Sequence, residues 1–288
     1  MREFKIFIIV AFFTGLIYYG VEPYAHHIMH PPVENPDYTF KDLSSLGATG
    51  NAANGEEIVM ANCTACHGIV SKGLDAPMQP LDAASAYGVV PPDLSNAGTI
   101  YDEKFLANFL KNPVTATHLS HKFDKDYASG KMYPMPSYGW MSNQEIADIV
   151  VYLKGIGSNE LSGKEIFDEA CARCHSMKYD KIYARTPTDN LKVYMGSTPP
   201  DLSMMIKSRG EHYLHTFINE PQKLLNGTAM PRVGLNEDSE VKLVKYMESI
   251  GDSKKDERES VGWKVMIFTI IFTIFAYLWK VKIWRDVH

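Results

Sequence analysis

Two short stretches of the sequence hold the residues best suited to chemistry, residues 63–67 (CTACH) and residues 171–175 (CARCH), and together they use all four cysteines of the 288-residue chain. Both have the pattern Cys-x-x-Cys-His, which is typical of covalent c-type haem attachment. The spacing has a chemical reason, because each thiol forms a thioether with one of the two haem vinyl groups and the adjacent imidazole then reaches the iron. The motifs predict two covalently bound haem c groups. The predicted attachment residues are Cys63, Cys66, His67, Cys171, Cys174 and His175.

Three other roles for paired cysteines compete with haem attachment. A redox Cys-x-x-Cys site would need the βαβ context of thioredoxin-like proteins, and the sequence shows no such pattern. A four-cysteine zinc site would have to join two pairs that are separated by 104 residues. Disulfides fit an exported chain, but the two-residue spacing makes each pair a poor structural clip. The repeat that surrounds the motifs favours haem over all three.

The two motifs lie in matching copies of a longer segment, at an offset of 108 residues. Residues 55–58 (GEEI) match residues 163–166 (GKEI), and the sequence PPDLS occurs at both 91–95 and 199–203. Further along, a Met-Pro pair recurs at an offset of 95, so the first copy contains 13 extra residues. Gly, Ser, Asp and Lys in this extra length predict a surface loop within 115–132.

A c-type haem iron needs a second axial ligand, and the repeat nominates Met135 and Met230, which occupy the same place in the two Met-Pro pairs. Ligation by thioether and imidazole raises the reduction potential and leaves no open position on the iron, which suits electron transfer rather than substrate chemistry. Met132, three residues before Met135, is the main rival ligand. His118 and His121, inside the extra segment, are bis-histidine alternatives for the first haem.

Both copies predict helices only, because no segment has convincing two-residue alternation of apolar and polar residues. Each copy has a helix before its cysteines, a middle helix (102–111 and 211–220) that ends near a proline, and a last helix with apolar residues at helical spacing. Asn143 and Asp238 are the predicted N-caps of the two last helices.

An apolar run lies near each end of the chain. The first, residues 6–21, is 16 residues long, shorter than the ~20 residues of an ideal span. No A-x-A-like cleavage site follows it, which favours an uncleaved anchor over a signal peptide. The second run, residues 265–279, is uncharged and is bordered by the lysines and tryptophans typical of membrane interfaces. Basic residues at the outer ends of both runs place both termini in the cytoplasm and the middle of the chain outside it.

The chain therefore divides into six predicted parts. These are an N-terminal transmembrane anchor (1–21), a proline-rich extended linker (22–50), two haem domains (51–157 and 158–252), a short linker (253–262) and a C-terminal transmembrane anchor (263–284). The composition is close to the globular average, with 45% hydrophobic and 22% charged residues, which excludes a disordered or polytopic chain. A formal net charge of −5 argues against a nucleic-acid partner.

These motifs resemble tandem class I cytochrome c domains, which are all-α. The resemblance implies that a glycine of the first helix packs against an aromatic residue of the last helix. It also implies that a proline carbonyl accepts a hydrogen bond from the outer nitrogen of the axial histidine and so orients the ring. The residues concerned are Gly55 with Tyr152 and Gly163 with Tyr246 for the packing, and Pro92 and Pro200 for the carbonyls.

The whole chain, including the YYGVEPYAHHIMHPP stretch at residues 18–32, is similar to the dihaem cytochrome c subunits of certain bacterial quinol:cytochrome c reductases, or cytochrome bc complexes. There such a subunit takes the place of the usual monohaem cytochrome c1. The resemblance implies an electron relay from a Rieske iron-sulfur protein, beside a cytochrome b subunit, to a soluble cytochrome c or a terminal oxidase. The subunit itself is then no catalyst.

The same resemblance implies the bacterial cytoplasmic membrane, haem domains on its periplasmic side and a dimeric complex. The alternative is the dihaem electron-input subunit of a cbb-type cytochrome c oxidase. A C-terminal anchor after the haem domains weighs against that alternative. A dihaem peroxidase would need one open iron position, and the matching methionines argue against it.

Overall fold

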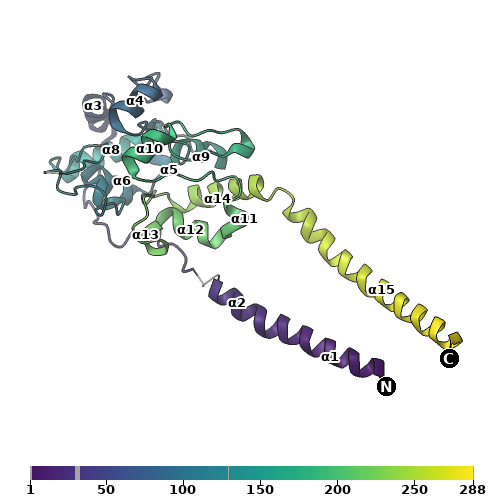
Figure 1. Cartoon of the computed structure of the whole chain (residues 1–288). Coiled ribbons are helices and arrows are strands. Elements are labelled where there is room, and N and C mark those ends of the chain that lie inside the picture. Colours follow the sequence, from purple (N-terminus) through teal and green to yellow (C-terminus); the bar gives the residue numbers. More distant parts are fainter. Residues whose placement is uncertain (1, 30–32, 129, 288) are drawn as a thin grey trace.

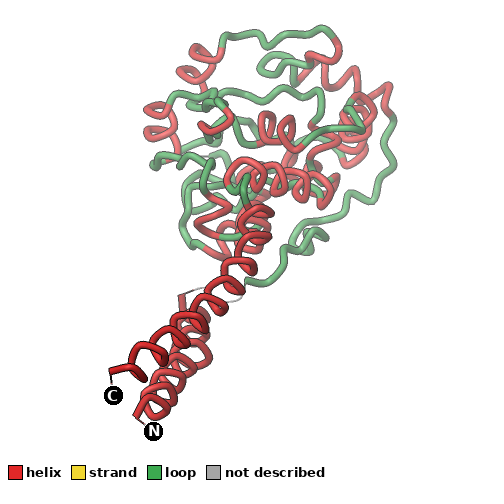
Figure 2. The backbone as a smooth tube through the Cα atoms, turned by 90° about the vertical axis from the view of Figure 1, so that its right-hand side faces the viewer, coloured by secondary structure: helices red, strands yellow, loops and turns green. Residues whose placement is uncertain are grey.

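The computed structural model describes residues 2–29, 33–128 and 130–287. Within these ranges the chain forms helices and loops, with isolated β-bridges and no strand, so the all-α prediction is confirmed. Two helical domains pack together, and the two terminal helices leave them in the same direction (Figure 1). A view turned by 90° shows the terminal helices side by side, with both chain ends at their far tips (Figure 2).

The first domain is built on the crossing of its first and last helices, α3 and α8. A Cβ atom at Gly55 of α3 would lie 2.0 Å from the carbonyl oxygen of Asp148 and 2.8 Å from Tyr152 Cβ, so only glycine permits this approach. The expected contact between Gly55 and Tyr152 is present. The elements of this domain are α3 (Ala52–Asn62), the 3₁₀ turn η2 (Val70–Lys72), α4 (Pro80–Tyr87), α5 (Ala97–Ile100), α6 (Glu103–Lys111), α7 (Pro113–Ala116) and α8 (Asn143–Ile156).

The second domain repeats this arrangement with α9 against α14. A Cβ atom at Gly163 would lie 2.2 Å from the carbonyl oxygen of Lys242 and 2.6 Å from Tyr246 Cβ, so the same close crossing needs the same residue. The elements are α9 (Gly163–Ala170), the 3₁₀ turn η3 (Lys178–Asp180), α10 (Thr188–Met195), α11 (Met205–Arg209), α12 (Glu211–Asn219), α13 (Pro221–Leu224) and α14 (Glu237–Gly251).

The N-caps of the two last helices differ from those predicted. Ser142 caps α8 in a reciprocal capping box with Glu145, so Asn143 is already the first helical residue. In α14 the cap is Asn236, whose side chain accepts from the Ser239 amide, and the predicted Asp238 lies inside the first turn. In each helix the side-chain oxygen of an earlier residue, the Ser142 hydroxyl or the Asn236 amide, accepts from a free backbone amide of the first turn.

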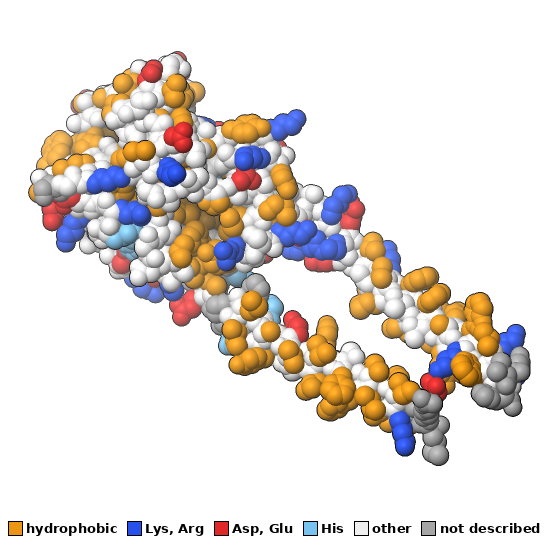
Figure 3. Space-filling view, in the orientation of Figure 1, with side chains coloured by type: hydrophobic (Ala, Val, Ile, Leu, Met, Phe, Trp, Pro, Cys, Tyr) orange, Lys and Arg blue, Asp and Glu red, His pale blue; other side chains and the backbone are white. Residues whose placement is uncertain are grey.

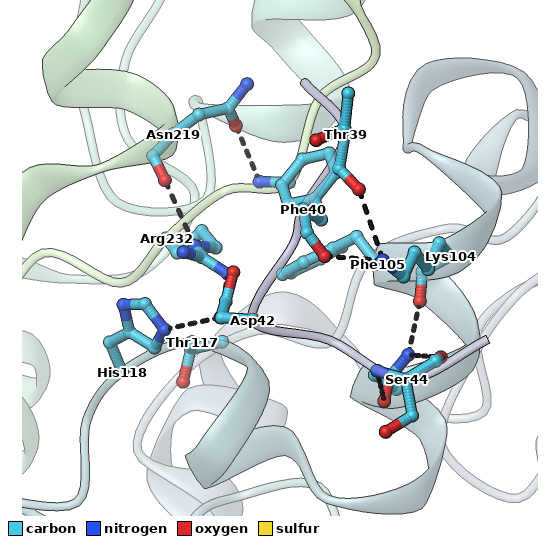
Figure 4. A network of polar contacts seen from close by, with 12 residues as sticks. Thr39, Phe40, Asp42, Ser44, Lys104, Phe105, Thr117, His118, Asn219 and Arg232 are labelled. Atoms are coloured by element: carbon cyan, nitrogen blue, oxygen red, sulfur yellow. Dashed lines mark hydrogen bonds and ion pairs between the residues drawn. The ribbon is translucent and has the colours of Figure 1, made fainter. Parts of the chain in front are cut away.

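Residues 33–50, called the strap below, are extended but are no free linker. Phe40 is buried, with 2% of its surface exposed, and Lys104 Nζ donates to its carbonyl oxygen at 2.7 Å. Asp42 contacts both domains, because its Oδ2 lies 2.8 Å from Arg232 of the second domain and 3.0 Å from His118 of the first (Figure 4). The strap is therefore part of the packed domain pair.

The start of the strap is bound to the second domain. Tyr38 donates to Glu240 Oε1 at 2.9 Å, and the Thr216 hydroxyl donates to the carbonyl oxygen of Glu34 at 2.6 Å. Glu240 is fully buried and also accepts from His215 Nδ1 at 2.9 Å. These contacts satisfy a buried carboxylate that would otherwise be costly.

The extra segment of the first copy is more than a surface loop. Leu119 and Phe123 of this segment are buried, with the preceding Val114, in a small cluster against which Tyr194 of the second domain packs. Ser129 lies outside the described residues. The sequence did not predict this packing, because the apolar residues of the segment are few and too irregularly spaced to give a periodic signal.

The N-terminal helix continues past the predicted anchor. α1 (Arg2–Leu16), a π-helical turn η1 (Ile17–Val21) and α2 (Glu22–Met29) form one continuous helix, so the first eight residues of the predicted linker are helical. Pro23 has no backbone N–H to donate, and the π turn just before it shifts the bonding pattern so that the helix continues through this position. Met1 and residues 30–32, including the linker prolines Pro31 and Pro32, lie outside the described residues.

The C-terminal helix also starts earlier than predicted, because α15 (Lys255–Val287) includes most of the expected linker 253–262. The segments Glu3–Met29 and Lys255–Arg285 are both long and apolar enough to cross a membrane, and hydrophobic side chains cover both (Figure 3). Lys280 pairs with Glu3 at 2.6 Å. Two candidate membrane helices thus flank the domain pair.

Candidate haem sites

The first Cys-x-x-Cys-His motif begins where α3 ends, because Cys63 is the C-cap of this helix. The next turn is tight: the amides of Cys66 and His67 donate to the Cys63 carbonyl at 3.1 and 3.0 Å. His67 Nδ1 then donates to the carbonyl oxygen of Pro92 at 2.7 Å, which fixes the ring and leaves Nε2 as the free nitrogen.

The second motif repeats this geometry after α9. The amides of Cys174 and His175 donate to the Cys171 carbonyl at 3.1 and 2.9 Å. His175 Nδ1 donates to the carbonyl oxygen of Pro200 at 2.8 Å. Both hydrogen bonds expected from the resemblance are therefore present, and each imidazole is oriented in the same way.

Burial controls the protonation of these side chains. It raises the pKa of the Cys63 thiol to about 11 and that of Cys171 to about 12, whereas redox-active thiols have a lowered pKa. Burial also lowers the pKa of His67 and His175, which favours the neutral imidazole that binds iron. Among the described residues no three His, Cys, Asp or Glu side chains converge on a metal-sized site, so the four-cysteine zinc alternative is wrong.

The two predicted methionine ligands both lie in loops and are half-buried. Met135 packs against the core of the first domain, and its carbonyl oxygen accepts from the Tyr127 hydroxyl at 3.1 Å. Met230 is held by a hydrogen bond of its amide to Thr228 Oγ1 at 3.3 Å. The rival Met132 is 41% exposed, which favours Met135 for a ligand that must face a haem.

The family model for cytochrome c matches residues 52–157 and again residues 161–251, more than half of the chain. The chain belongs to the cytochrome c family. Cytochrome c domains carry covalently bound haem c and serve electron transfer, so this cytochrome is an electron-transfer protein with helices able to anchor it in a membrane.

Comparison with solved structures finds a chain of "Hyperthermophilic respiratory Complex III" that is 25% identical to this cytochrome. The match covers 44% of this chain and 75% of that chain, with a TM-score of 0.35, which does not establish a shared overall fold. No curated protein matches.

The residues of the cytochrome fit haem c at both motifs. Each motif presents two thiols for the vinyl groups and one imidazole whose Nδ1 is already engaged. A buried, unpaired donor, the Nε atom of Arg173, lies within the second motif. A bound haem would supply a one-electron redox centre at each motif.

The bis-histidine alternative for the first site is disfavoured by the hydrogen bonds of the two histidines. His118 Nε2 lies 3.0 Å from Asp42 of the strap. His121 Nε2 donates to the carbonyl oxygen of Thr228 at 3.2 Å. These contacts use Nε2 of each ring, the nitrogen that the two attachment histidines keep free.

Sequence reasoning missed the part played by the aspartates of the two PPDLS segments. Asp93 accepts from the amides of Val70 and Ser95, at 3.1 and 2.8 Å. Asp201 accepts in the same way from the amides of Lys178 and Ser203, both at 3.1 Å. Each carboxylate thus links two segments. One is the segment of the proline whose carbonyl orients the histidine, and the other is the loop that follows the Cys-x-x-Cys-His motif. The exact recurrence of PPDLS was the available signal.

Each Met-Pro segment also contacts the other domain. The Tyr194 hydroxyl of the second domain donates to the Met132 carbonyl at 3.0 Å. In the opposite direction, the Arg232 amide, two residues after Met230, donates to the carbonyl of Thr117 at 3.1 Å. The loops that carry the two proposed methionine ligands therefore both take part in the contact between the domains.

Proposed function

We propose that this protein is the dihaem cytochrome c subunit of a bacterial cytochrome bc complex, in the role of cytochrome c1. It receives electrons from the Rieske iron-sulfur protein after quinol oxidation and delivers them to a soluble cytochrome c or a terminal oxidase. It forms no bonds with substrate, so it is an electron-transfer subunit and no catalyst on its own.

The observation that carries this proposal is the placement of two cytochrome c domains between two candidate membrane helices. The helices leave the domain pair in one direction and are joined by the Lys280–Glu3 ion pair. This supports a topology in which both termini are cytoplasmic and both haem domains lie on the periplasmic side of the cytoplasmic membrane. A second span after the haem domains favours the cytochrome bc complex over the cbb-type oxidase.

In this proposal each domain holds one haem c by two thioethers and two axial ligands. The first haem site consists of Cys63, Cys66, His67 and Met135, and the second of Cys171, Cys174, His175 and Met230. Pro92 and Pro200 orient the imidazoles through the hydrogen bonds described above. With a histidine and a methionine available at each site, a bound haem would supply one-electron transfer and would have no open position for peroxide, which separates this relay from a dihaem peroxidase.

Affinity purification of the full chain in a mild detergent tests the proposed complex. Co-purification of a cytochrome b and a Rieske protein supports it, and their native mass also reports whether the complex is dimeric. Recovery of a copper-haem oxidase instead overturns it in favour of the cbb-type alternative. Carbon monoxide binding by the purified, reduced protein would show an open iron and refute six-coordinate ligation at that site.

A further inference from the structure

The loop of the first domain that carries Met135 is bonded to the second domain by Tyr194, which lies in the last turn of α10. The Tyr194 hydroxyl donates to the Met132 carbonyl at 3.0 Å. Its ring packs on Phe123, with ring centroids 5.3 Å apart, and its centroid lies 5.0 Å from Lys131 Nζ. Lys131 in turn donates to the Tyr194 carbonyl. These contacts hold a side chain of the second domain against the residues just before Met135.

The loop of the second domain that carries Met230 is bonded to the first domain on both sides of the methionine. Two residues before it, the Thr228 carbonyl accepts a hydrogen bond from His121 Nε2 at 3.2 Å. Two residues after it, the Arg232 amide donates to the carbonyl of the buried Thr117 at 3.1 Å. Both contacts come from the extra segment of the first domain, so the copy that lacks this segment still uses it.

Each loop is also held by its own domain, so the contacts across the interface complete a partial support. Gln222 Nε2 donates to the same Thr228 carbonyl at 2.8 Å, and the Tyr127 hydroxyl donates to the Met135 carbonyl at 3.1 Å. A carbonyl oxygen has two lone pairs, so that of Thr228 is satisfied by one donor from each domain. Loss of the donor from the other domain should therefore loosen the loop without unfolding its own domain.

We propose that each domain positions the axial methionine of the other haem, with His121 acting on Met230 and Tyr194 acting on Met135. This rests on the proposed ligation of iron by the two methionines. A loop methionine leaves its iron when the loop opens locally, and the contacts that hold the loop set the population of this open state. Both donors bond to main-chain carbonyls within three residues of a methionine, so they lower that population from across the interface. His121 and Tyr194 are therefore positioning residues.

Imidazole titration of the oxidised full-length protein, followed by visible spectroscopy, measures the open population at each haem. Imidazole binds only to an iron whose methionine has left, so its apparent affinity rises in proportion to that population. Met135→Ala and Met230→Ala each open one iron and so assign the two binding phases. His121→Phe should tighten imidazole binding at the second haem by about two- to tenfold, the effect of one lost hydrogen bond, and Tyr194→Phe should do so at the first haem.

This crossed pattern is a readout that a general disturbance would not produce, because each substitution acts on the haem of the other domain. His121→Gln keeps an N–H donor and should restore most of the native behaviour. Ser120→Ala and Tyr183→Phe remove exposed hydroxyls that have no hydrogen-bond partner among the described residues, and should leave both haems unchanged. Unchanged binding in either His121→Phe or Tyr194→Phe, or a change at the haem of the mutated domain itself, overturns this inference. If neither methionine variant changes imidazole binding, the proposed ligation fails instead.

Discussion

The two cytochrome c domains share one attachment geometry but differ in what holds the loop around it. In the first domain, the extra segment supports the Met-Pro loop, because the Tyr127 hydroxyl donates to the Met135 carbonyl. The second domain lacks this segment, and its Met-Pro loop is instead bonded to the first domain through the Arg232 amide. The residues proposed to attach the haem and bind its iron are alike in the two domains, whereas the contacts that hold the two Met-Pro loops differ. Neither loop is held by its own domain alone.

The largest expected effect comes from replacing the proposed axial methionines, one domain at a time. Met135→Ala and Met230→Ala should each leave both haems attached but open the iron of one domain only, with that potential lowered by roughly 0.1–0.3 V, within the span of about 0.8 V that axial ligands cover. Carbon monoxide binding and redox titration measure both effects. Met132→Ala is the control and should be nearly silent. Two unchanged potentials would refute the ligand assignment.

The crossing of the first and last helices should contribute equally to the stability of the two domains. Gly55→Val and Gly163→Val each force a side chain into a backbone carbonyl and should lower the free energy of unfolding by about 2–4 kcal/mol. Urea unfolding followed by circular dichroism measures the loss. Gly155→Ala, on α8 with nothing within 4 Å of the added methyl group, is the control and should cost nothing. Tolerance of valine at either crossing would contradict the close packing.

One hydrogen bond between the two domains is made by the buried hydroxyl of Thr186. Thr186→Val keeps the shape of the side chain but leaves the buried Val90 amide without an acceptor, which should cost about 1–3 kcal/mol. Thermal unfolding measures this, with the exposed Thr198→Val as the matched control. Equal stability of both variants would mean that Thr186 does not couple the domains.

A smaller difference should appear in the pH dependence of stability. The hydrogen bond from His215 to Glu240 raises the pKa of His215, and burial raises that of Glu240. His215 binds its proton more tightly in the folded state, so its contribution to stability is fully present below about pH 6.5 and is lost as pH rises through its raised pKa. Urea midpoints from pH 6 to 9 should fall more steeply for the native protein than for His215→Gln. The exposed His212→Gln should follow the native profile.

The sequence predicted the haem sites well because the chemistry there is local. The Cys-x-x-Cys-His turns, and the carbonyls of Pro92 and Pro200, follow from short spacings that the duplication displays twice. The tight glycine crossings at Gly55 and Gly163 were implied by the resemblance for the same reason.

The strap and the domain interface could not be predicted because their partners are far apart in sequence. Asp42 and Arg232 are 190 residues apart, and no local pattern links them. The proline-rich composition of 22–50 indicated an extended chain without showing that Phe40 is buried. The same prolines led to a predicted linker from residue 22, whereas a π turn before Pro23 lets the helix continue to Met29.

The strap also has a consequence for the order of folding. Chains are synthesised and exported from the N-terminus, so Glu34, Tyr38 and Asp42 emerge long before their partners in the second domain, which are Thr216, Glu240 and Arg232 respectively. The strap is therefore made early, but its contacts with the second domain can form only after that domain has been synthesised and folded. A fully docked strap thus requires both halves of the protein.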